Sequence, residues 1–107
     1  MIELTEEVEL RKCFKKNTKV VALFYASWCP FCRSFLSFFN KQSERNQKGI
    51  FIRVKIDEDE NPLWETYSLV AVPSVILFEN GQPLRRLDCE LGVGLTEKQF
   101  SKWLGTS

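Results

Sequence analysis

Cys29 and Cys32, separated by two residues, are the side chains of this sequence best suited to chemistry. Pro30 lies between them and suits the first position of a helix, where its missing N–H costs nothing. We therefore expect Cys29 at the mouth of a helix and Cys32 one turn inside it, close enough for a disulfide. A helix N-terminus favours negative charge and so favours the thiolate of the outer cysteine. The spacing predicts a site for thiol–disulfide exchange.

A structural zinc site is the main alternative for a C-x-x-C motif, but it takes four ligands, often from two such pairs. The other two cysteines, Cys13 and Cys89, stand alone, and the chain has no histidine. The sequence therefore favours thiol exchange without a metal or cofactor. We expect Cys13 and Cys89 to be small buried or half-buried residues, with a regulatory role for either as the alternative.

The composition is that of an ordinary globular domain. The chain has 107 residues, 44% hydrophobic and 27% charged, with a net charge of +1. These values predict a single domain over residues 1–107 and show no sign of the basic patch that binds nucleic acid. The longest apolar run, residues 20–26, is far too short to cross a membrane. The acidic N-terminus lacks the pattern of a signal peptide, so a cytosolic protein is expected.

Residues 20–26 are predicted to form the strand that leads to the two cysteines. A continuous apolar run of this length is typical of a strand buried on both faces. A helix follows, predicted from Pro30 to Gln47 and closed by Gly49. Its core face has i, i+3, i+4, i+7 spacing and consists of Cys32, Phe35, Leu36 and Phe39. Phe31 lies off this face.

The remaining segments show strand and helix patterns in turn. In chain order they are a strand at 2–4, a helix capped by Thr5, a strand at 50–56, a short helix capped by Asn61 and ending near Tyr67, strands at 74–78 and from 84 to 87 or 89, and a last helix opened by Thr96 and Gln99. Asn80-Gly81 is a strong hairpin signal, so the last two strands should be antiparallel. The acids at 57–60 are interpreted as charges before a helix N-terminus rather than as a metal site. An α/β fold follows, with a mixed central sheet and helices on both faces.

Four segments of the chain resemble the thioredoxin family, which includes thioredoxins and the domains of protein disulfide isomerases. They are YASWCPFC, which contains the W-C-x-x-C pattern, KIDEDENP, LVAVPSVILFENGQ and GLTEKQFSKWL. They occur in the family's order and cover nearly the whole chain. The resemblance implies the thioredoxin fold, in which a mixed sheet of four to five strands is flanked by four helices.

The resemblance also implies roles for individual residues. Cys29 is similar to the exposed nucleophile that attacks a target disulfide, and Cys32 to the buried thiol that resolves the mixed disulfide. Trp28 resembles the residue that borders the active-site loop. Val72-Pro73 resembles the family's cis-proline turn, which faces the disulfide and lets the Val72 backbone pair with substrate. A trans proline at a strand entry is the alternative for this turn.

Trp28 and Phe31 are expected to form, with Pro30, an apolar surface that docks substrate around the outer cysteine. Phe31 lies off the core face of its helix and between the cysteines, so its ring should face outward. The alternative is that the ring folds down against Phe35 or Phe38.

Some positions depart from the family's pattern. Leu23 stands where thioredoxins usually bury an aspartate that exchanges a proton with the inner cysteine. The dipeptide between the cysteines is Pro-Phe rather than Gly-Pro, closer to glutaredoxins, which affects the redox poise. Ser37 replaces the proline that kinks the second helix. Arg53 falls where the family often has a lysine near the buried acid, and without that partner it should turn to solvent or support the outer thiolate.

The residues and the resemblance together predict a thiol–disulfide oxidoreductase. We expect it to act on protein disulfides as a monomer, with an electron donor of the thioredoxin-reductase type. A glutaredoxin-like enzyme that uses glutathione is the first alternative, suggested by the Pro-Phe dipeptide. A non-catalytic thioredoxin-fold module that binds a partner is the second, although two intact cysteines argue against it. No nucleic acid, membrane, cofactor or metal is expected.

Overall fold

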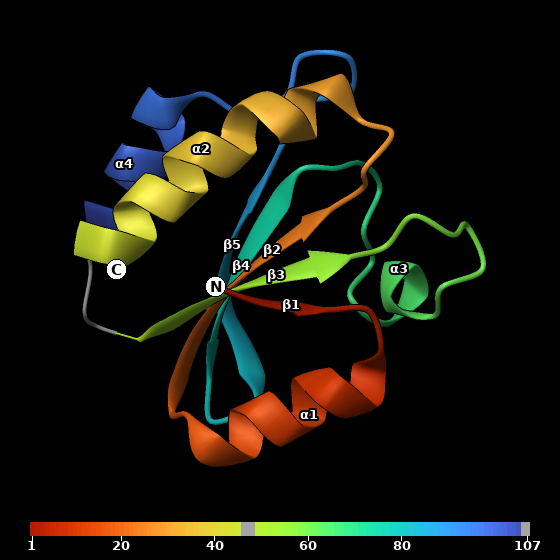
Figure 1. The fold of residues 1–107 in the computed structure, drawn as a ribbon, viewed down its shortest axis with the longest axis vertical. Helices are drawn as coiled ribbons and strands as arrows, with labels where there is room; N and C mark the ends of the chain where they lie inside the picture. Colours follow the sequence, from red (N-terminus) through yellow and green to blue (C-terminus); the bar gives the residue numbers. More distant parts are fainter. Residues whose placement is uncertain (46–48, 106–107) are drawn as a thin grey trace.

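The computed structural model describes residues 1–45 and 49–105 of the chain (Figure 1). Within these residues the strands and helices follow the order that the sequence predicts. The strands are β1 (Ile2–Leu4), β2 (Lys19–Tyr25), β3 (Ile50–Lys55), β4 (Ser74–Glu79) and β5 (Gln82–Asp88). The helices are α1 (Glu7–Lys16), α2 (Pro30–Arg45), α3 (Leu63–Thr66) and α4 (Glu97–Gly105).

The described strands form one mixed five-stranded sheet in the order β1-β3-β2-β4-β5. β1, β3 and β2 run parallel, which requires crossover connections such as α1 and α2. β4 is antiparallel to β2, and the hairpin to β5 adds a second antiparallel pair. α2 and α4 lie on one side of the sheet, and α1 and α3 lie on the other (Figure 1). The predicted α/β architecture is confirmed.

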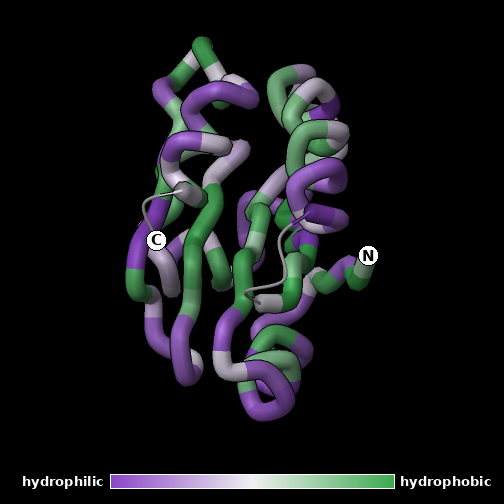
Figure 2. The backbone as a smooth tube through the Cα atoms, turned by 90° about the vertical axis from the view of Figure 1, so that its left-hand side faces the viewer, coloured by the Kyte–Doolittle hydropathy of each residue, from purple (hydrophilic) through white to green (hydrophobic). Residues whose placement is uncertain are grey.

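The central strand, β2, is apolar because both of its faces are covered. All of its residues from Val20 to Tyr25 are buried. Figure 2 shows hydrophobic strands, in green, running between helices that carry more hydrophilic residues. β2 therefore leads the chain from the middle of the sheet directly to the segment with the first cysteine.

Aromatic rings hold α2 against α4 and the sheet. The rings of Phe35 and Phe100 are 5.1 Å apart, and those of Phe39 and Phe51 are 5.3 Å apart. The predicted core face is fully buried at Cys32, Phe35 and Phe39. Its remaining residue, Leu36, is half-buried. Burying a phenylalanine contributes roughly 1.5–3 kcal/mol, so this packing fixes the position of the helix that carries the cysteines.

Two local signals in the sequence are confirmed, and a third is displaced by one residue. Asn80 and Gly81 have positive φ values of 52° and 78°, as a two-residue hairpin of type I′ requires. At the start of α4, Gln99 Oε1 accepts the Thr96 N–H at 2.9 Å, and Thr96 Oγ1 accepts the Gln99 N–H at 3.1 Å. This is the predicted capping box. At the start of α3, Asn61 Oδ1 accepts the Leu63 N–H at 3.0 Å as a cap would, although the N-cap position itself is Pro62, one residue later than predicted.

The predicted start of α1 is wrong by one residue. Its N-cap is Glu6 rather than Thr5. The Glu9 carboxylate reaches back and accepts the backbone N–H groups of both Thr5 and Glu6, each at 3.1 Å. The Glu9 carboxylate thus closes a capping box on Glu6, and Thr5 lies one residue before the helix cap. The predicted strand ends also differ from the observed ones by one or two residues.

The prediction for the end of α2 stays a prediction. The described helix runs to Arg45 without interruption at Ser37, and the predicted end at Gln47 lies outside the described residues. Gly49, which was predicted to close this helix, also makes a close contact with the start of β2. A Cβ at this position would lie 2.7 Å from the carbonyl oxygen of Lys19, so the glycine permits a close approach of two backbone segments.

Candidate active site

Cys29 lies where the chain leaves β2 and enters α2, and it occupies the N-cap position of that helix. Its N–H donates to the Ala26 carbonyl at 3.2 Å, and its own carbonyl accepts the Arg33 N–H at 3.3 Å. Its Sγ accepts the backbone N–H of Cys32 at 3.3 Å. A sulfur in this position satisfies a helix N–H that would otherwise lack a partner, and a thiolate does so better than a thiol.

Cys32 is fully buried in the first turn of α2. Burial raises the pKa of its thiol strongly, and the interaction with Cys29 raises it further. The Ala26 backbone N–H acts in the opposite direction without reversing the shift. The predicted burial of the inner cysteine is confirmed, and Cys32 is a protonated thiol at neutral pH.

The prediction that Cys29 faces solvent is wrong. The residue is only 4% exposed. Its thiol lies 3.6 Å from the carbonyl oxygen of Val72, to which it donates. The peptide bond between Val72 and Pro73 is cis, as the resemblance implies. The turn before β4 thus covers Cys29, which the sequence could not show because the contact joins residues far apart in the chain.

A small apolar hollow gives access to Cys29, and we call it the active-site groove. Its volume is about 250 Å³. It is lined by Trp28, Cys29, Pro30, Phe31, Trp64, Val70, Ala71, Val72, Cys89, Leu91 and Gly92. Four of the five residues predicted to bind substrate are therefore in its wall, and Pro73 is not. The other wall residues apart from Cys29 were not predicted from the sequence, because Trp64 lies in the short helix α3 and the rest lie in loops without a regular hydrophobic period.

Trp28 and Phe31 are partly exposed at the groove, with exposed fractions of 55% and 39%. The predicted outward position of Phe31 is confirmed. On its other side Phe31 packs against Gly94, where a Cβ would lie 2.8 Å from the Phe31 Cβ. Gly94 also has a φ of 81°, which favours glycine. The loop after β5 therefore rests directly on the residue between the two cysteines.

Asp57 fixes the loop that precedes the cysteines. Its Oδ1 accepts the Ser27 N–H at 2.8 Å, and its carbonyl oxygen accepts the Trp28 Nε1–H at 3.1 Å. Burial acts to raise the pKa of Asp57, but the hydrogen bonds from Ser27 outweigh it and the pKa is lowered. The sequence analysis assigned this acid to a helix terminus. Its position just after β3, the parallel neighbour of β2, was the available signal.

Leu23 is fully buried on the side of the sheet that faces α2. In the register of the sheet it is paired with Arg53 of β3. Arg53 neither turns fully to solvent nor reaches Cys29, because its Nη2 forms a salt bridge of 3.7 Å with Glu3 of β1. The Arg53 Nε is buried without a hydrogen-bond partner. Arg53 is thus partly exposed to solvent, and its ion pair is with Glu3 rather than with the Cys29 thiolate.

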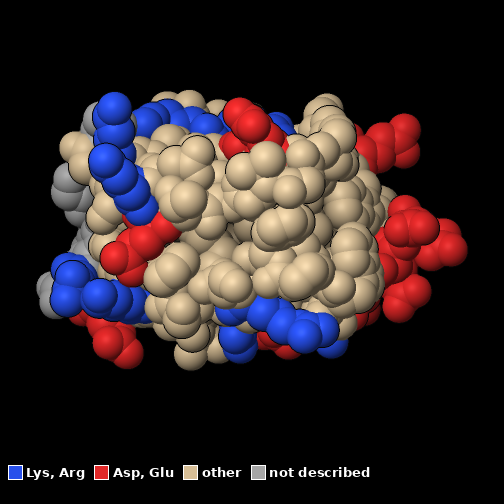
Figure 3. All heavy atoms as spheres, turned by 90° about the horizontal axis from the view of Figure 1, so that it is seen from above, with Lys and Arg blue, Asp and Glu red and all other residues tan. Residues whose placement is uncertain are grey.

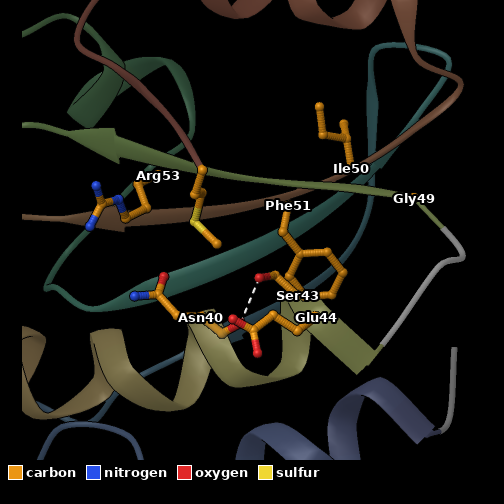
Figure 4. Close-up of a pocket in the computed structure, with 8 residues that line it drawn as sticks. Asn40, Ser43, Glu44, Gly49, Ile50, Phe51 and Arg53 are labelled. Atoms are coloured by element: carbon orange, nitrogen blue, oxygen red, sulfur yellow. Dashed lines mark hydrogen bonds between the residues drawn. The ribbon is translucent and has the colours of Figure 1, made fainter.

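A larger hollow lies beside Arg53 between α2 and β3, and we call it the Arg53 pocket. Its volume is about 550 Å³. It is lined by Met1, Asn40, Ser43, Glu44, Gly49, Ile50, Phe51 and Arg53. Figure 4 shows Phe51 pointing toward α2 and Ile50 pointing away from it, with the Ser43 hydroxyl hydrogen-bonded to the Asn40 carbonyl at 2.6 Å. None of these lining residues is a cysteine, so the pocket has no thiol that could exchange with a disulfide.

The two remaining cysteines differ from one another. Cys13 is half-buried in α1, as predicted, and burial raises its pKa. Cys89 is also half-buried, but it lies in the wall of the active-site groove. Burial raises the pKa of Cys89, and the neighbouring charge of Cys29 adds to the effect. Cys89 is therefore part of the site, which its isolated place in the sequence did not indicate.

The described part of the chain shows neither a metal-binding cluster nor a membrane-spanning helix. Residues 1–45 and 49–105 contain no group of three or more cysteine, aspartate or glutamate side chains that could hold a metal ion. No helix in the same part of the chain is long and apolar enough to cross a membrane.

A mixed sheet that brings a C-x-x-C motif to a helix N-terminus, opposite a cis-proline turn, defines a thiol–disulfide exchange protein with the thioredoxin fold. The thioredoxin family model matches residues 2–104. The chain belongs to the thioredoxin family.

Known thioredoxins are similar to this chain over most of their length. A thioredoxin of Mycoplasmoides gallisepticum is 30% identical over 82 residues, covering 77% of this chain and 81% of that protein. A thioredoxin of Echinococcus granulosus is 32% identical over 90 residues, covering 82% of this chain and 77% of that protein. The crystal structure of the reduced thioredoxin pre-protein of Schistosoma mansoni is 26% identical, with a TM-score of 0.81 and coverage of 98% of this chain and 95% of that one.

The class of reaction follows from the family. Thioredoxins are protein-disulfide oxidoreductases, and this chain is a thiol–disulfide oxidoreductase of that type. None of these comparisons favours the glutaredoxin-like alternative or the non-catalytic one.

Proposed function

We propose that Cys29 attacks a disulfide of a target protein and that Cys32 resolves the mixed disulfide. The observation that carries this proposal is the hydrogen bond from the Cys32 N–H to Cys29 Sγ, at 3.3 Å. A helix N–H stabilises negative charge on the sulfur that accepts it, and Cys29 is that sulfur. Cys32 is fully buried, so a target disulfide meets Cys29 first.

The reaction moves two electrons from the cysteine pair to the target. The Cys29 thiolate attacks one target sulfur, the target disulfide breaks, and the second target sulfur leaves as a thiolate that takes up a proton. Cys32 then loses its proton and attacks Cys29 Sγ. The bond between Cys29 and the target breaks, the first target sulfur leaves and is protonated, and a Cys29–Cys32 disulfide remains.

The target docks on the apolar surface around Cys29. Trp28 and Phe31 supply exposed aromatic area, and the Val72 backbone lies beside the attacking sulfur. Figure 3 looks down on the end of the molecule where α2 begins and the loop after β5 lies, as Figure 1 shows. Uncharged residues cover the middle of that face, and the charged side chains gather at its margins (Figure 3). Such a surface suits an extended, largely apolar segment next to a disulfide.

Reduction of insulin disulfides tests the assignment of the two cysteines. Cys29→Ser should abolish turnover, and Cys32→Ser should still form a covalent adduct with the target through Cys29. Cys13→Ser is the matched control, because this half-buried cysteine of α1 is not in the groove wall and its loss should leave turnover unchanged. Turnover by Cys29→Ser at the rate of the natural protein would overturn the assignment.

The electron donor is proposed to be an enzyme of the thioredoxin-reductase type. A bifunctional thioredoxin reductase/thioredoxin of Mycobacterium leprae is 30% identical over 89 residues, which cover 80% of this chain and 19% of that protein. In that protein the two activities share one chain, which supports pairing this chain with such a reductase. Turnover with a thioredoxin reductase and NADPH should exceed turnover with glutathione. The reverse order would favour a glutaredoxin-like enzyme.

Residues 1–107 are proposed to act as one monomeric domain in the cytosol. A mitochondrial thioredoxin-2 of Schizosaccharomyces pombe is 39% identical over 81 residues, covering 76% of this chain and 56% of that protein, so the family also works in an organelle. Light scattering checks the monomer, and microscopy of the tagged chain in its own cell checks the compartment. Import into an organelle would contradict the cytosolic location.

A further inference from the structure

We propose that Cys89 is a second resolving thiol, which attacks the mixed disulfide on Cys29 in competition with Cys32. The inference rests on the proposed attack by Cys29 and adds a residue to that reaction. It starts from the observation that the active-site groove contains two cysteines in its wall, Cys29 and Cys89. A target bound through Cys29 therefore places its disulfide in a hollow that a further thiol already lines.

The sheet register brings Cys89 to this place. Ser74 of β4 is paired with Asp88 of β5 in an antiparallel ladder. The ladder ends at this pair, so Pro73 and Cys89 are the next residues of the two strands beyond the same end of the sheet. The neighbour of Pro73 is Val72, whose carbonyl oxygen is 3.6 Å from Cys29 Sγ. The cis-proline turn is thus flanked by the two cysteines.

The loop that starts with Cys89 is held against the active-site helix. Glu90 and Gly94 form an isolated bridge, which closes the loop on itself. Gly94 then packs on Phe31, the residue between Cys29 and Cys32, at a distance that would leave no room for a Cβ. This contact keeps Cys89 beside the groove while a target is bound there.

Burial distinguishes the two candidate resolving thiols. Cys32 is fully buried, whereas Cys89 is half-buried. Burial raises the pKa of both thiols, and the pKa of Cys32 is raised much more strongly. The attacking species in disulfide exchange is the thiolate, so Cys89 supplies a larger thiolate fraction than Cys32 at the same pH. Cys32 in turn has the fixed geometry of the first helical turn.

Resolution by Cys89 transfers the same two electrons to the target as resolution by Cys32. Cys89 loses a proton to solvent, and its thiolate attacks Cys29 Sγ of the mixed disulfide. The bond between Cys29 and the target breaks, and the target sulfur leaves with the electron pair and is protonated. A Cys29–Cys89 disulfide forms, so two thiols of this chain are oxidised and one target disulfide is reduced to two thiols. Such a bond requires the two Cα atoms to come within ~7 Å.

The decisive experiment follows the adduct that Cys32→Ser forms with insulin. Non-reducing electrophoresis and intact mass should show that this adduct decays and leaves an internal disulfide. Peptide mapping should locate that disulfide between Cys29 and Cys89. The double variant Cys32→Ser/Cys89→Ser should keep its adduct about tenfold longer or more, which corresponds to ~1.4 kcal/mol of barrier. Cys32→Ser/Cys13→Ser is the matched control and should behave like Cys32→Ser alone.

Equal adduct lifetimes in Cys32→Ser and Cys32→Ser/Cys89→Ser would overturn the role of Cys89. So would a map without the Cys29–Cys89 pair. Cys32→Ser/Cys89→Ala repeats the measurement with a different side chain if the serine variant unfolds. Failure of the proposed function looks different, because Cys29→Ser would then form the adduct or retain insulin turnover.

Discussion

The active-site groove and the Arg53 pocket differ in both size and chemistry. The Arg53 pocket, at about 550 Å³, is the larger, and the groove measures about 250 Å³. The wall of the pocket carries an arginine, a glutamate and two polar uncharged side chains, whereas the groove is lined by aliphatic and aromatic residues and two cysteines. The smaller hollow holds the reactive site because apolar walls meet a helix N-terminus there, so that thiols are desolvated beside a backbone N–H.

Leu23 lies in the central strand β2 and lines neither hollow. It is paired with Arg53 of β3 on one side and with Val75 of β4 on the other. A leucine offers the arginine no charge, and Arg53 reaches the other way to Glu3 of β1. Arg53 is therefore engaged with β1 rather than with β2. We therefore expect the thiol chemistry of the active-site groove to be independent of the Arg53 pocket.

Leu23→Asp should have the largest effect, because it places a carboxylate inside the buried central strand. Leu23 is fully buried, so we expect the free energy of unfolding to fall by a few kcal/mol. Denaturant titration measures this loss, and Leu23→Val serves as the control for lost volume without charge. A Leu23→Asp variant as stable as Leu23→Val would show that water or Arg53 already reaches this position.

The same variant should resolve its mixed disulfide faster at pH 7. In the natural chain the thiolate fraction of Cys32 limits resolution, since burial raises the pKa of that thiol. The rate should therefore rise with pH through the neutral range, whereas an aspartate that accepts the Cys32 proton should make the Leu23→Asp rate less dependent on pH. Equal rates for both proteins at pH 7 would mean that another group moves the proton or that Cys89 resolves the mixed disulfide.

Much of the fold could be predicted because its signals are local. The Asn80-Gly81 hairpin, the Thr96 cap and the spacing of Cys32, Phe35 and Phe39 each depend on a few neighbouring residues. The features of the site that were missed depend on the register between distant segments.

Three residues illustrate the long-range part. Cys29 is covered by the carbonyl of Val72, and Cys89 enters the groove wall through the pairing of β5 with β4. Asp57 holds the loop that contains Trp28 because β3 ends beside β2. Each of these contacts joins residues that are separated in the sequence by at least one complete helix or strand. Hydrophobic period and capping rules compare near neighbours in the sequence, so they could not indicate these contacts.

Stability should also depend on pH through the buried thiols. The pKa of Cys32 is raised in the folded protein, so the unfolded chain loses this proton first, near its ordinary pKa of about 8.5. Above that pH the unfolded state binds fewer protons than the folded state, and the free energy of unfolding falls by up to ~1.4 kcal/mol per pH unit. Cys13 and Cys89 act in the same direction.

Denaturant titrations under reducing conditions at pH 7.5 and 9.5, values about one unit either side of the ordinary thiol pKa, check this dependence. Cys32→Ala should flatten the decline, because it removes the thiol with the strongest burial. A decline of the same size in Cys32→Ala would assign the effect to other groups, such as Tyr25 and Tyr67, whose pKa values burial also raises.

Phe31→Ala should weaken function with little loss of stability, because Phe31 belongs to the groove and is 39% exposed. We expect a severalfold drop in kcat/KM for insulin reduction, carried by KM, equivalent to ~1 kcal/mol of docking energy. Phe35→Ala is the matched contrast, since Phe35 is fully buried and its loss should cost ~3–5 kcal/mol of stability. Similar melting temperatures for the two variants would place Phe31 in the core instead.

Arg53→Met should have the smallest effect on activity and tests whether the Arg53 pocket is independent of the groove. Its salt bridge to Glu3 is long, at 3.7 Å, and both partners are partly exposed, so its loss should cost less than ~1 kcal/mol. Methionine also removes the Arg53 Nε, which is buried without a hydrogen-bond partner. Insulin turnover and its pH profile should therefore match those of the natural chain.

The double variant Leu23→Asp/Arg53→Met completes the comparison. If the arginine turns toward a new aspartate, the double variant should be less stable than the sum of the two single changes predicts, because the buried carboxylate then lacks a cation. Additive losses would show that Arg53 stays with Glu3 even when β2 offers it a charge. A drop in turnover in Arg53→Met alone would contradict the separation of the two hollows, because their walls share no residue.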